Sequence, residues 1–153
     1  MSADAKLAEL NLQLPPIPKP GGVYKPVVIV GNMAYVSGHV SVRADGSIIA
    51  GRVGSEVDQE YGKKAAEGSA LAILTTLKAN LGSLDRVKRV VKTLGMVNST
   101  AEFTNHPEVI NGCSELWAKV WGSENGVGAR SAVGMGSLPR NSTVEVEAIF
   151  ELA

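Results

Sequence analysis

The sequence has few of the residues that support redox, metal or disulfide chemistry. Its 153 residues include one cysteine, Cys113, and two histidines, His39 and His106. One cysteine cannot form an internal disulfide, and no Cys/His cluster has the spacing of a zinc site. We therefore expect no bound metal and no cofactor. The cysteine content fits a reducing, cytoplasmic location.

The chain also lacks an excess of charge and a long apolar run. Fifteen Lys and Arg residues balance fifteen Asp and Glu residues, so no overall positive field attracts nucleic acid. No apolar run approaches the ~18 residues of a membrane span, and the N-terminal sequence does not resemble a secretory signal. Hydrophobic residues make up 44% of the chain. At this length, that content predicts one soluble, globular domain with a single core.

Prolines are concentrated near the N-terminus, in the sequence LPPIPKP at residues 14–20. Residues 3–10 have helical composition, but the prolines after them fix φ and remove backbone donors. We expect residues 1–20 to form an arm that lies across the protein's own domain, residues 21–153. Docking of the proline-rich stretch to an SH3-like partner is the alternative.

After the arm, hydrophobic periodicity and turn residues predict strands and two helices. In chain order these are a hairpin at 27–36, a short strand at 47–50, a helix from the capping-box sequence at 55–58 to Gly82, a strand at 86–98, a helix from Asn105 to Gly122, and strands at 129–135 and 143–152. This order indicates an α+β domain, in which both helices pack on one face of a mostly antiparallel sheet.

The last strand alternates strictly, which assigns its residues to the two faces of the sheet. Val144 and the apolar residues at every second position after it face the helices. Glu145 and Glu147 then face the other way, and we place Arg130 on that same open face. An uncovered sheet face of this size commonly contacts another subunit, so we expect an oligomer.

Two C-terminal segments resemble the signature of the YjgF/Rid family: ARSAVGMGSLPR at residues 129–140 and the strand VEVEAI at 144–149. Segments Gly22–Tyr24, Gly31–Met33 and Val36–Gly38 are similar to the family's first hairpin. The resemblance extends over the chain after the arm. It implies a chorismate-mutase-like fold.

The resemblance also implies a homotrimer with clefts between its subunits, each binding a small carboxylate metabolite. Arg130 would form a bidentate pair with the substrate carboxylate. Glu145 would position or activate the water that attacks an imine carbon, and ammonia would leave as the keto acid forms. Arg130 and Glu145 are therefore the expected catalytic residues of an imine or enamine deaminase.

A set of substrate-binding residues follows from the same resemblance. Tyr24 would line the cleft and hydrogen-bond the substrate. The turn at Ser37 and Gly38 and the backbone N–H of Ala132 would form a polar wall, and Asn111 would contribute at the interface. For Tyr24 the alternative is packing over the sheet edge, and for Asn111 it is an exposed helix position.

Three positions depart from the better-known deaminases. Ala132 stands where many members have cysteine, Gly128 replaces a usual proline, and His39 replaces a frequent glutamine. These differences indicate a distinct subgroup, so the substrate of the better-known members does not carry over. His39 is a candidate for proton transfer, with a loop histidine of no chemical role as the alternative.

Structural alternatives exist for the charged and nucleophilic residues. Arg130 could form a salt bridge with Glu147 instead of binding a ligand. A plain hairpin of the last two strands would bring Glu147 nearer to Arg130 than Glu145, so which glutamate lines the cleft stays open. Cys113 lies within an apolar helix face and is interpreted as a buried structural thiol.

Two further functions are alternatives to deamination. A non-catalytic protein of the same fold could bind a stable carboxylate in the same cleft. Endoribonuclease activity, an older label of the family, is third because it requires cations that neutralise phosphates. The only basic run, within residues 86–92, spreads its cations over both faces of a strand.

Overall fold

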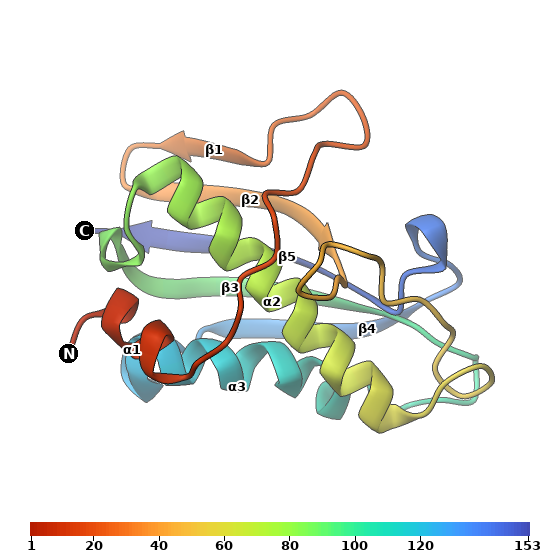
Figure 1. Ribbon diagram of the computed structural model, residues 1–153. Coiled ribbons are helices and arrows are strands. Elements are labelled where there is room, and N and C mark those ends of the chain that lie inside the picture. Colours follow the sequence, from red (N-terminus) through yellow and green to blue (C-terminus); the bar gives the residue numbers. More distant parts are fainter.

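The computed structural model describes all residues from Met1 to Ala153. A five-stranded sheet forms one layer, and two long helices pack on one of its faces (Figure 1). The elements are α1 (Ala3–Glu9), β1 (Val27–Val30), β2 (Met33–Val40), α2 (Gln59–Leu81), η1 (Leu84–Arg86), β3 (Val87–Asn98), α3 (His106–Asn125), β4 (Ala129–Met135), η2 (Pro139–Asn141) and β5 (Val144–Leu152). The predicted α+β class, with both long helices on one face, is confirmed. None of the helices combines the length and the apolarity needed to cross a membrane.

The strands lie in the order β1-β2-β5-β3-β4. Neighbouring strands are antiparallel except β3 and β4, which are parallel and are connected through α3. Parallel neighbours require such a crossover. As a result β3 lies between β4 and β5, and the predicted hairpin register of the last two strands is wrong.

Caps and glycines define the ends of the two long helices. Helix α2 begins after Asp58, whose side chain accepts a hydrogen bond from Tyr61 N at 2.9 Å, and it ends at Gly82 with φ of 83°. The cap is therefore the last residue of the predicted capping box at 55–58, not the first. Helix α3 does not end at Gly122: this residue has φ of 82° and kinks the helix, which continues to Asn125.

The predicted strand at 47–50 does not form. Residues 41–58 are a loop, tied to its surroundings by two isolated bridges, Ala50 with Ser142 and Val53 with Ser99. The backbone turns on both sides of this short segment, so it forms isolated bridges and no strand. Three glycines with positive φ make these turns possible: Gly46, Gly51 and Gly54.

The core lies between the sheet and the two long helices. Alternate residues of β5, from Val144 to Leu152, point into it as predicted. Phe150 contacts Trp117 of α3, with ring centroids 5.3 Å apart. Gly112 of α3 lies directly against the backbone of Lys63 in α2, so the absence of a side chain permits the close crossing of the helices.

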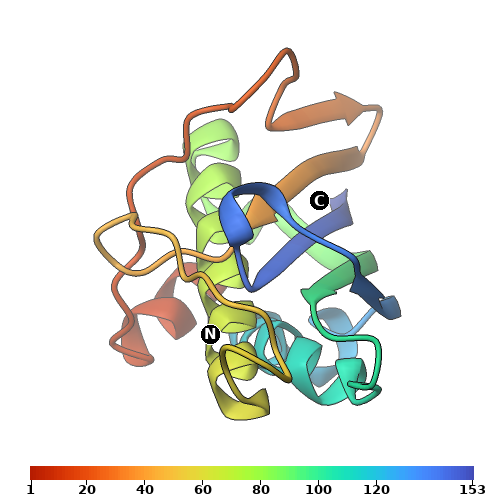
Figure 2. The same cartoon turned by 90° about the vertical axis from the view of Figure 1, so that its right-hand side faces the viewer.

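The N-terminal arm crosses the outside of α2 (Figures 1 and 2). At its start, the backbone N–H of Ala3 donates to Asp85 Oδ1 at 2.6 Å, and Asp4 pairs with Lys78 at 3.2 Å. Further along, the hydroxyl of Thr75 in α2 donates to Pro15 O at 3.0 Å. The arm is thus attached to its own domain at several points.

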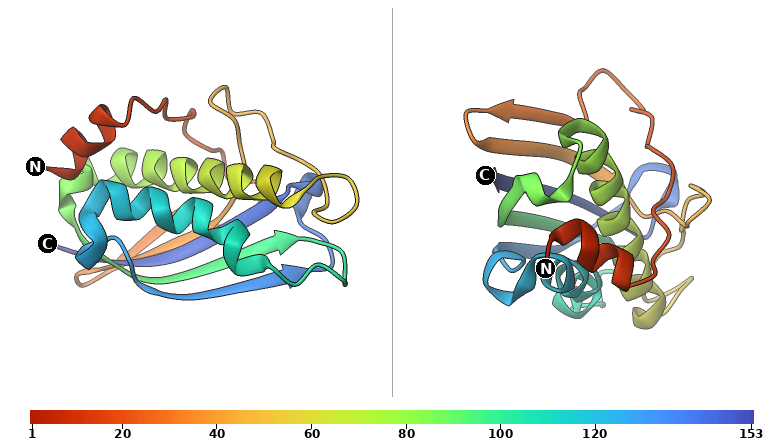
Figure 3. Two further views of the ribbon diagram at one scale, coloured as in Figure 1. Left: turned by 90° about the horizontal axis from the view of Figure 1, so that it is seen from below. Right: turned by 60° about the vertical axis from the view of Figure 1, so that its left-hand side comes forward.

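The sheet face opposite the helices is uncovered (Figure 3, left). Large apolar side chains on this face remain exposed, among them Val28, Tyr35 and Val133. Tyr35 lies beside Ile149 of the central strand β5, so this apolar patch extends from β1 and β2 onto the central strand.

Candidate functional site

Arg130 lies on the helix side of β4, not on the open face predicted for it. It is in register with Thr93 of β3, which is buried beneath the helices, and Thr93 pairs with Ala148 of β5. Glu145 and Glu147 occupy the alternate positions of β5 and face the other way. The prediction that Arg130 shares a sheet face with Glu145 and Glu147 is wrong, because β4 runs parallel to β3 and does not form a hairpin with β5.

Helix α3 holds the guanidinium group of Arg130. Its Nη1 donates to Asn111 Oδ1 at 2.8 Å and to Ser114 Oγ at 3.2 Å, and its Nη2 donates to Pro107 O at 3.4 Å. We call Arg130, Asn111 and Ser114 the arginine half-site. No carboxylate of the chain forms an ion pair with Arg130, so the alternative salt bridge to Glu147 does not form within one chain.

Two donors of this guanidinium have no hydrogen-bond acceptor within the chain. A guanidinium has five N–H donors, and the three hydrogen bonds above leave Nε–H and one Nη2–H without an acceptor. Nε and Nη2 form one edge of the planar fork, the geometry that binds a carboxylate through two hydrogen bonds. Ala132, two residues further along β4, packs against the core and places no polar side chain beside this edge.

Asn111 is oriented by a charged network that joins α3 to α2. Its Nδ2 donates to Glu108 Oε2 at 3.3 Å, and Glu108 pairs with Lys63 at 2.9 Å. The hydrogen bond from Lys63 lowers the pKa of Glu108, and Asn111 and Arg130 lower it further. Because Glu108 stays ionised, it attracts the amide nitrogen of Asn111 and leaves Oδ1 to face Arg130.

The other predicted site residues line a hollow of about 1100 Å³ beside β2. We call Tyr24, Ser37, Gly38 and Glu145 the glutamate half-site. The hollow borders the part of β2 that β1 leaves unpaired, since the pairing of β1 ends at Val36. The Tyr24 hydroxyl accepts a hydrogen bond from the N–H of Gly21 at 3.1 Å, and Ser37 Oγ donates to a backbone carbonyl at 2.6 Å.

Glu145 has no hydrogen-bond donor and no cation in contact with its carboxylate. The carboxylate lies against Gly38, where a Cβ atom would collide with it. Burial raises the pKa of Glu145, and the nearby Glu147 raises it further. A carboxylate with a raised pKa in a hollow is typical of functional sites. Both glutamates line the hollow, and Glu145 is the less exposed.

His39 is a buried strand residue and not a loop residue. Its Nδ1 lies 2.6 Å from Ser37 O and donates to it, and its Nε2 accepts from the Thr76 hydroxyl at 2.7 Å. Burial lowers the pKa of His39, so the ring is neutral and both nitrogens are engaged. Cys113 is also buried, and burial raises the pKa of its thiol. The interpretation of Cys113 as a structural thiol is confirmed.

The two half-sites do not meet within one chain. Arg130 and Glu145 are two strands apart and three residues out of register. At the spacing of a sheet this corresponds to roughly 10 Å across the strands and roughly 10 Å along them, on opposite faces. Each chain therefore presents a cationic half-site near β4 and an anionic half-site near β2.

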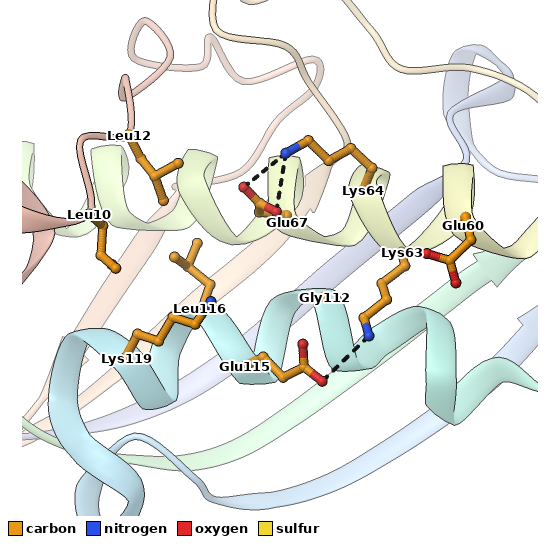
Figure 4. Close-up of a pocket in the computed structure, with 10 residues that line it drawn as sticks. All are labelled: Leu10, Leu12, Glu60, Lys63, Lys64, Glu67, Gly112, Glu115, Leu116 and Lys119. Atoms are coloured by element: carbon orange, nitrogen blue, oxygen red, sulfur yellow. Dashed lines mark hydrogen bonds and ion pairs between the residues drawn. The ribbon is translucent and has the colours of Figure 1, made fainter.

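A smaller hollow of about 330 Å³ lies between α2 and α3 (Figure 4). Its charged side chains largely pair with one another, Lys63 with Glu115 at 3.5 Å and Lys64 with Glu67 at 3.3 Å. None of the predicted site residues lines this hollow. Its charges are compensated internally, so we assign it no chemistry.

The basic run in β3 is engaged in local contacts. Lys88 and Arg89 both pair with Glu151, each at 2.9 Å. Lys92 Nζ donates to Ser131 Oγ at 3.1 Å. These cations already have partners, so the strand is a poor surface for phosphate groups.

The hollow beside β2 also contains residues that the sequence did not single out. Arg140, arm residues 16–20 and Gly21 line it. Arg140 lies within the family signature, so the motif contained a signal for it. Nothing in the composition of the arm indicated that it would face the site.

Comparison with known proteins places the chain in a family. Residues 4–152 match a family model described as "YjgF/chorismate_mutase-like, putative endoribonuclease". Protein TCP17 of Trypanosoma cruzi is 40% identical over 148 residues, which cover 97% of this chain and 92% of TCP17. The crystal structure of Atu1372, a protein of unknown function from Agrobacterium tumefaciens, matches with a TM-score of 0.88 and 43% identity, over 98% of this chain and 91% of that one.

A more distant relative has a named activity. The 2-iminobutanoate/2-iminopropanoate deaminase of Dermatophagoides farinae is 25% identical over 141 residues, which cover 90% of this chain and 92% of the deaminase. Fold, signature segments and family model agree over nearly the whole length of the sequence. The chain therefore belongs to the YjgF/chorismate mutase-like family.

Proposed function

We propose that the protein hydrolyses small imines or enamines derived from amino acids, in a site formed where the arginine half-site of one copy meets the glutamate half-site of another. One observation carries the proposal: an unoccupied guanidinium edge and an unpaired carboxylate lie on opposite sides of the same chain. In a closed ring, each copy supplies its arginine half-site to one neighbour and its glutamate half-site to the other. A homotrimer assembled over the open sheet face would use both halves of every chain.

In the proposed reaction the substrate carboxylate pairs with the Nε and Nη2 edge of Arg130, which fixes the position of the imine carbon. Glu145 accepts a proton from a water molecule as that water adds to the carbon. Glu145 passes that proton to the imine nitrogen, which gives a neutral carbinolamine. The carbinolamine hydroxyl then transfers its proton through Glu145 to the nitrogen, the C–N bond breaks, and ammonia leaves as the keto acid forms. The raised pKa of Glu145 suits this role, because a general base works best when its pKa approaches the working pH.

The deaminase from Dermatophagoides farinae supports this reaction class. A non-catalytic carboxylate-binding protein is the second candidate, and two features favour it. Ala132 supplies no thiol, and both nitrogens of His39 are engaged in hydrogen bonds. Glu145 would thus transfer protons without help from an imidazole or a thiol.

Freshly generated 2-aminoacrylate tests the proposal, with release of the 2-oxo acid as the signal. We expect a rate above that of buffer for the unchanged chain. Arg130→Lys keeps the charge but loses the paired donors, so kcat/KM should fall by roughly 10- to 100-fold. Glu145→Gln should reduce kcat. Arg86→Lys, at an exposed cation outside both half-sites, is the matched control and should leave the rate unchanged.

The two candidates give different results in this experiment. If no imine is hydrolysed faster than in buffer, the deaminase proposal is wrong. If, at the same time, pyruvate raises the melting temperature and Arg130→Lys abolishes the increase, the non-catalytic candidate is correct.

A further inference from the structure

The hollow beside β2 is much larger than a three-carbon imino acid requires. Its volume of about 1100 Å³ exceeds the ~300–1,000 Å³ typical of pockets for drug-sized ligands. A substrate bound at Arg130 and Glu145 through its carboxylate and imine carbon would leave most of this space unfilled. The substrate side chain is the part that would extend into it.

Charged and polar residues line much of this hollow, but one part of its wall is apolar and poor in hydrogen-bond donors. On the outer side stands the segment Pro16–Pro20, in which three of five residues are prolines and so have no N–H. Ile17 of this segment is 64% exposed. On the inner side the hollow is lined by Val42, Ile48 and Ala72. This part of the wall favours an apolar group over a polar one, since it offers few partners for a polar group that leaves water.

The outer wall is fixed in place before any ligand arrives. Thr75 anchors the carbonyl of Pro15 at 3.0 Å on one side, and the Tyr24 hydroxyl anchors the N–H of Gly21 at 3.1 Å on the other. The prolines between these anchors restrict the backbone further. A preformed wall lowers the ordering cost of binding, so contacts with it add to affinity.

We propose that arm segment 16–20, together with Val42 and Ile48, forms a subsite for a large apolar side chain, so that imines of amino acids with long aliphatic side chains are the preferred substrates. The proposal rests on the proposed function for the placement of the carboxylate and the imine carbon. It adds the substrate class and assigns the arm the role of determining specificity.

Stable 2-oxo acids test the subsite without turnover. Pyruvate, 2-oxopentanoate, 2-oxooctanoate and 2-oxoglutarate are titrated into the full chain by calorimetry. Each methylene that becomes buried should tighten binding by about fourfold, so 2-oxooctanoate should bind at least about tenfold more tightly than pyruvate. The second carboxylate of 2-oxoglutarate should give no such gain, although Lys19 and Arg140 also line the hollow.

Two variants connect this preference to the arm. Ile17→Asn should reduce the preference for 2-oxooctanoate over pyruvate by about threefold or more and leave pyruvate binding unchanged. Because Ile17 is largely exposed, this change should not impair folding. Val23→Asn, at a fully exposed apolar residue outside the hollow, is the matched control and should preserve the wild-type preference.

A parallel hydrolysis assay compares the imino acids formed from leucine and from alanine. If neither is hydrolysed but 2-oxooctanoate still binds more tightly than pyruvate in an Ile17-dependent manner, the deaminase proposal fails and the subsite stands. If pyruvate and 2-oxooctanoate bind equally well, if 2-oxoglutarate binds most tightly, or if Ile17→Asn changes nothing, the subsite is overturned whatever the outcome of the hydrolysis assay.

Discussion

At the scale of single residues, the two charged groups of the proposed site are held by opposite means. Arg130 is fixed by three hydrogen bonds to α3, which leave one edge of its fork available. The carboxylate of Glu145 makes no hydrogen bond, and it is placed by contact with Gly38. The orientation of Glu145 therefore depends on a residue without a side chain.

Gly38→Ala should displace the Glu145 carboxylate while the chain remains folded. A misplacement of ~1 Å at a reacting group can reduce the rate by up to about 100-fold, so we expect kcat to fall by about tenfold or more. Steady-state kinetics and circular dichroism measure the two effects. Gly136→Ala is the control, because nothing lies within 4 Å of its added methyl group. Wild-type kcat in Gly38→Ala would show that this contact does not position the glutamate.

Glu145→Gln should change the pH dependence of stability. Burial and Glu147 raise the pKa of Glu145 in the folded chain, so the folded chain retains this proton to a higher pH than the unfolded chain does. The associated stabilisation is complete below the ordinary carboxyl pKa and is lost as the pH rises through the raised pKa. Removing the charge should therefore raise the melting temperature at pH 7, and the gain should vanish near pH 4. A gain of equal size at both pH values would contradict the raised pKa.

At the scale of elements, the helix layer depends on the close crossing of α2 and α3 at Gly112. Gly112→Ala would drive a methyl group into the backbone of Lys63, and a backbone atom cannot move aside as a side chain can. We expect a loss of about 1–3 kcal/mol, as for other overpacked cores, measured by denaturant unfolding. Gly62→Ala is the graded comparison, since its added methyl meets only the side chains of Val53 and Val109. If the two variants lose equal free energy of unfolding, the close packing of the helix backbones at Gly112 does not limit the space there.

The elements could be predicted from sequence wherever a local pattern determines them. The alternation from Val144 onward predicted both faces of β5, and the apolar stripes of α2 and α3 predicted the helix layer. The partner of β4 could not be predicted in this way. Whether β4 pairs with β5 or with β3 depends on where α3 returns the chain, which is a property of tertiary packing. The same error placed Arg130 on the wrong face.

At the scale of the whole molecule, the chain exposes an uncovered sheet face with an apolar patch, and two separate half-sites. The sequence predicted which residues carry the charges through the family signature, but their separation into two places became visible only in the fold. Both features are explained together if copies of the chain associate through the open face and join unlike half-sites. The assembly and the site would then depend on each other.

Ile149→Lys should dissociate this assembly. Ile149 lies on the open face of the central strand β5, beside Tyr35, so a lysine there would bury a charge in any interface. We expect a trimeric mass for the unchanged chain by analytical ultracentrifugation, and a monomeric mass with loss of activity for Ile149→Lys. Ile29→Lys is the matched control: Ile29 is 49% exposed, but it pairs with buried Ala34 and so faces the other side of the sheet. A monomeric mass for the unchanged chain would reject the assembly.

A mixing experiment tests most directly whether the two half-sites belong to different copies. Arg130→Ala and Glu145→Gln chains, each inactive alone, are unfolded together in equal amounts and refolded. If each site takes Arg130 from one copy and Glu145 from its neighbour, random mixing makes about a quarter of the sites complete, and we expect about a quarter of the wild-type activity to return. If the mixture remains as inactive as either variant alone, each site is formed within one chain and the proposed interfacial site is wrong.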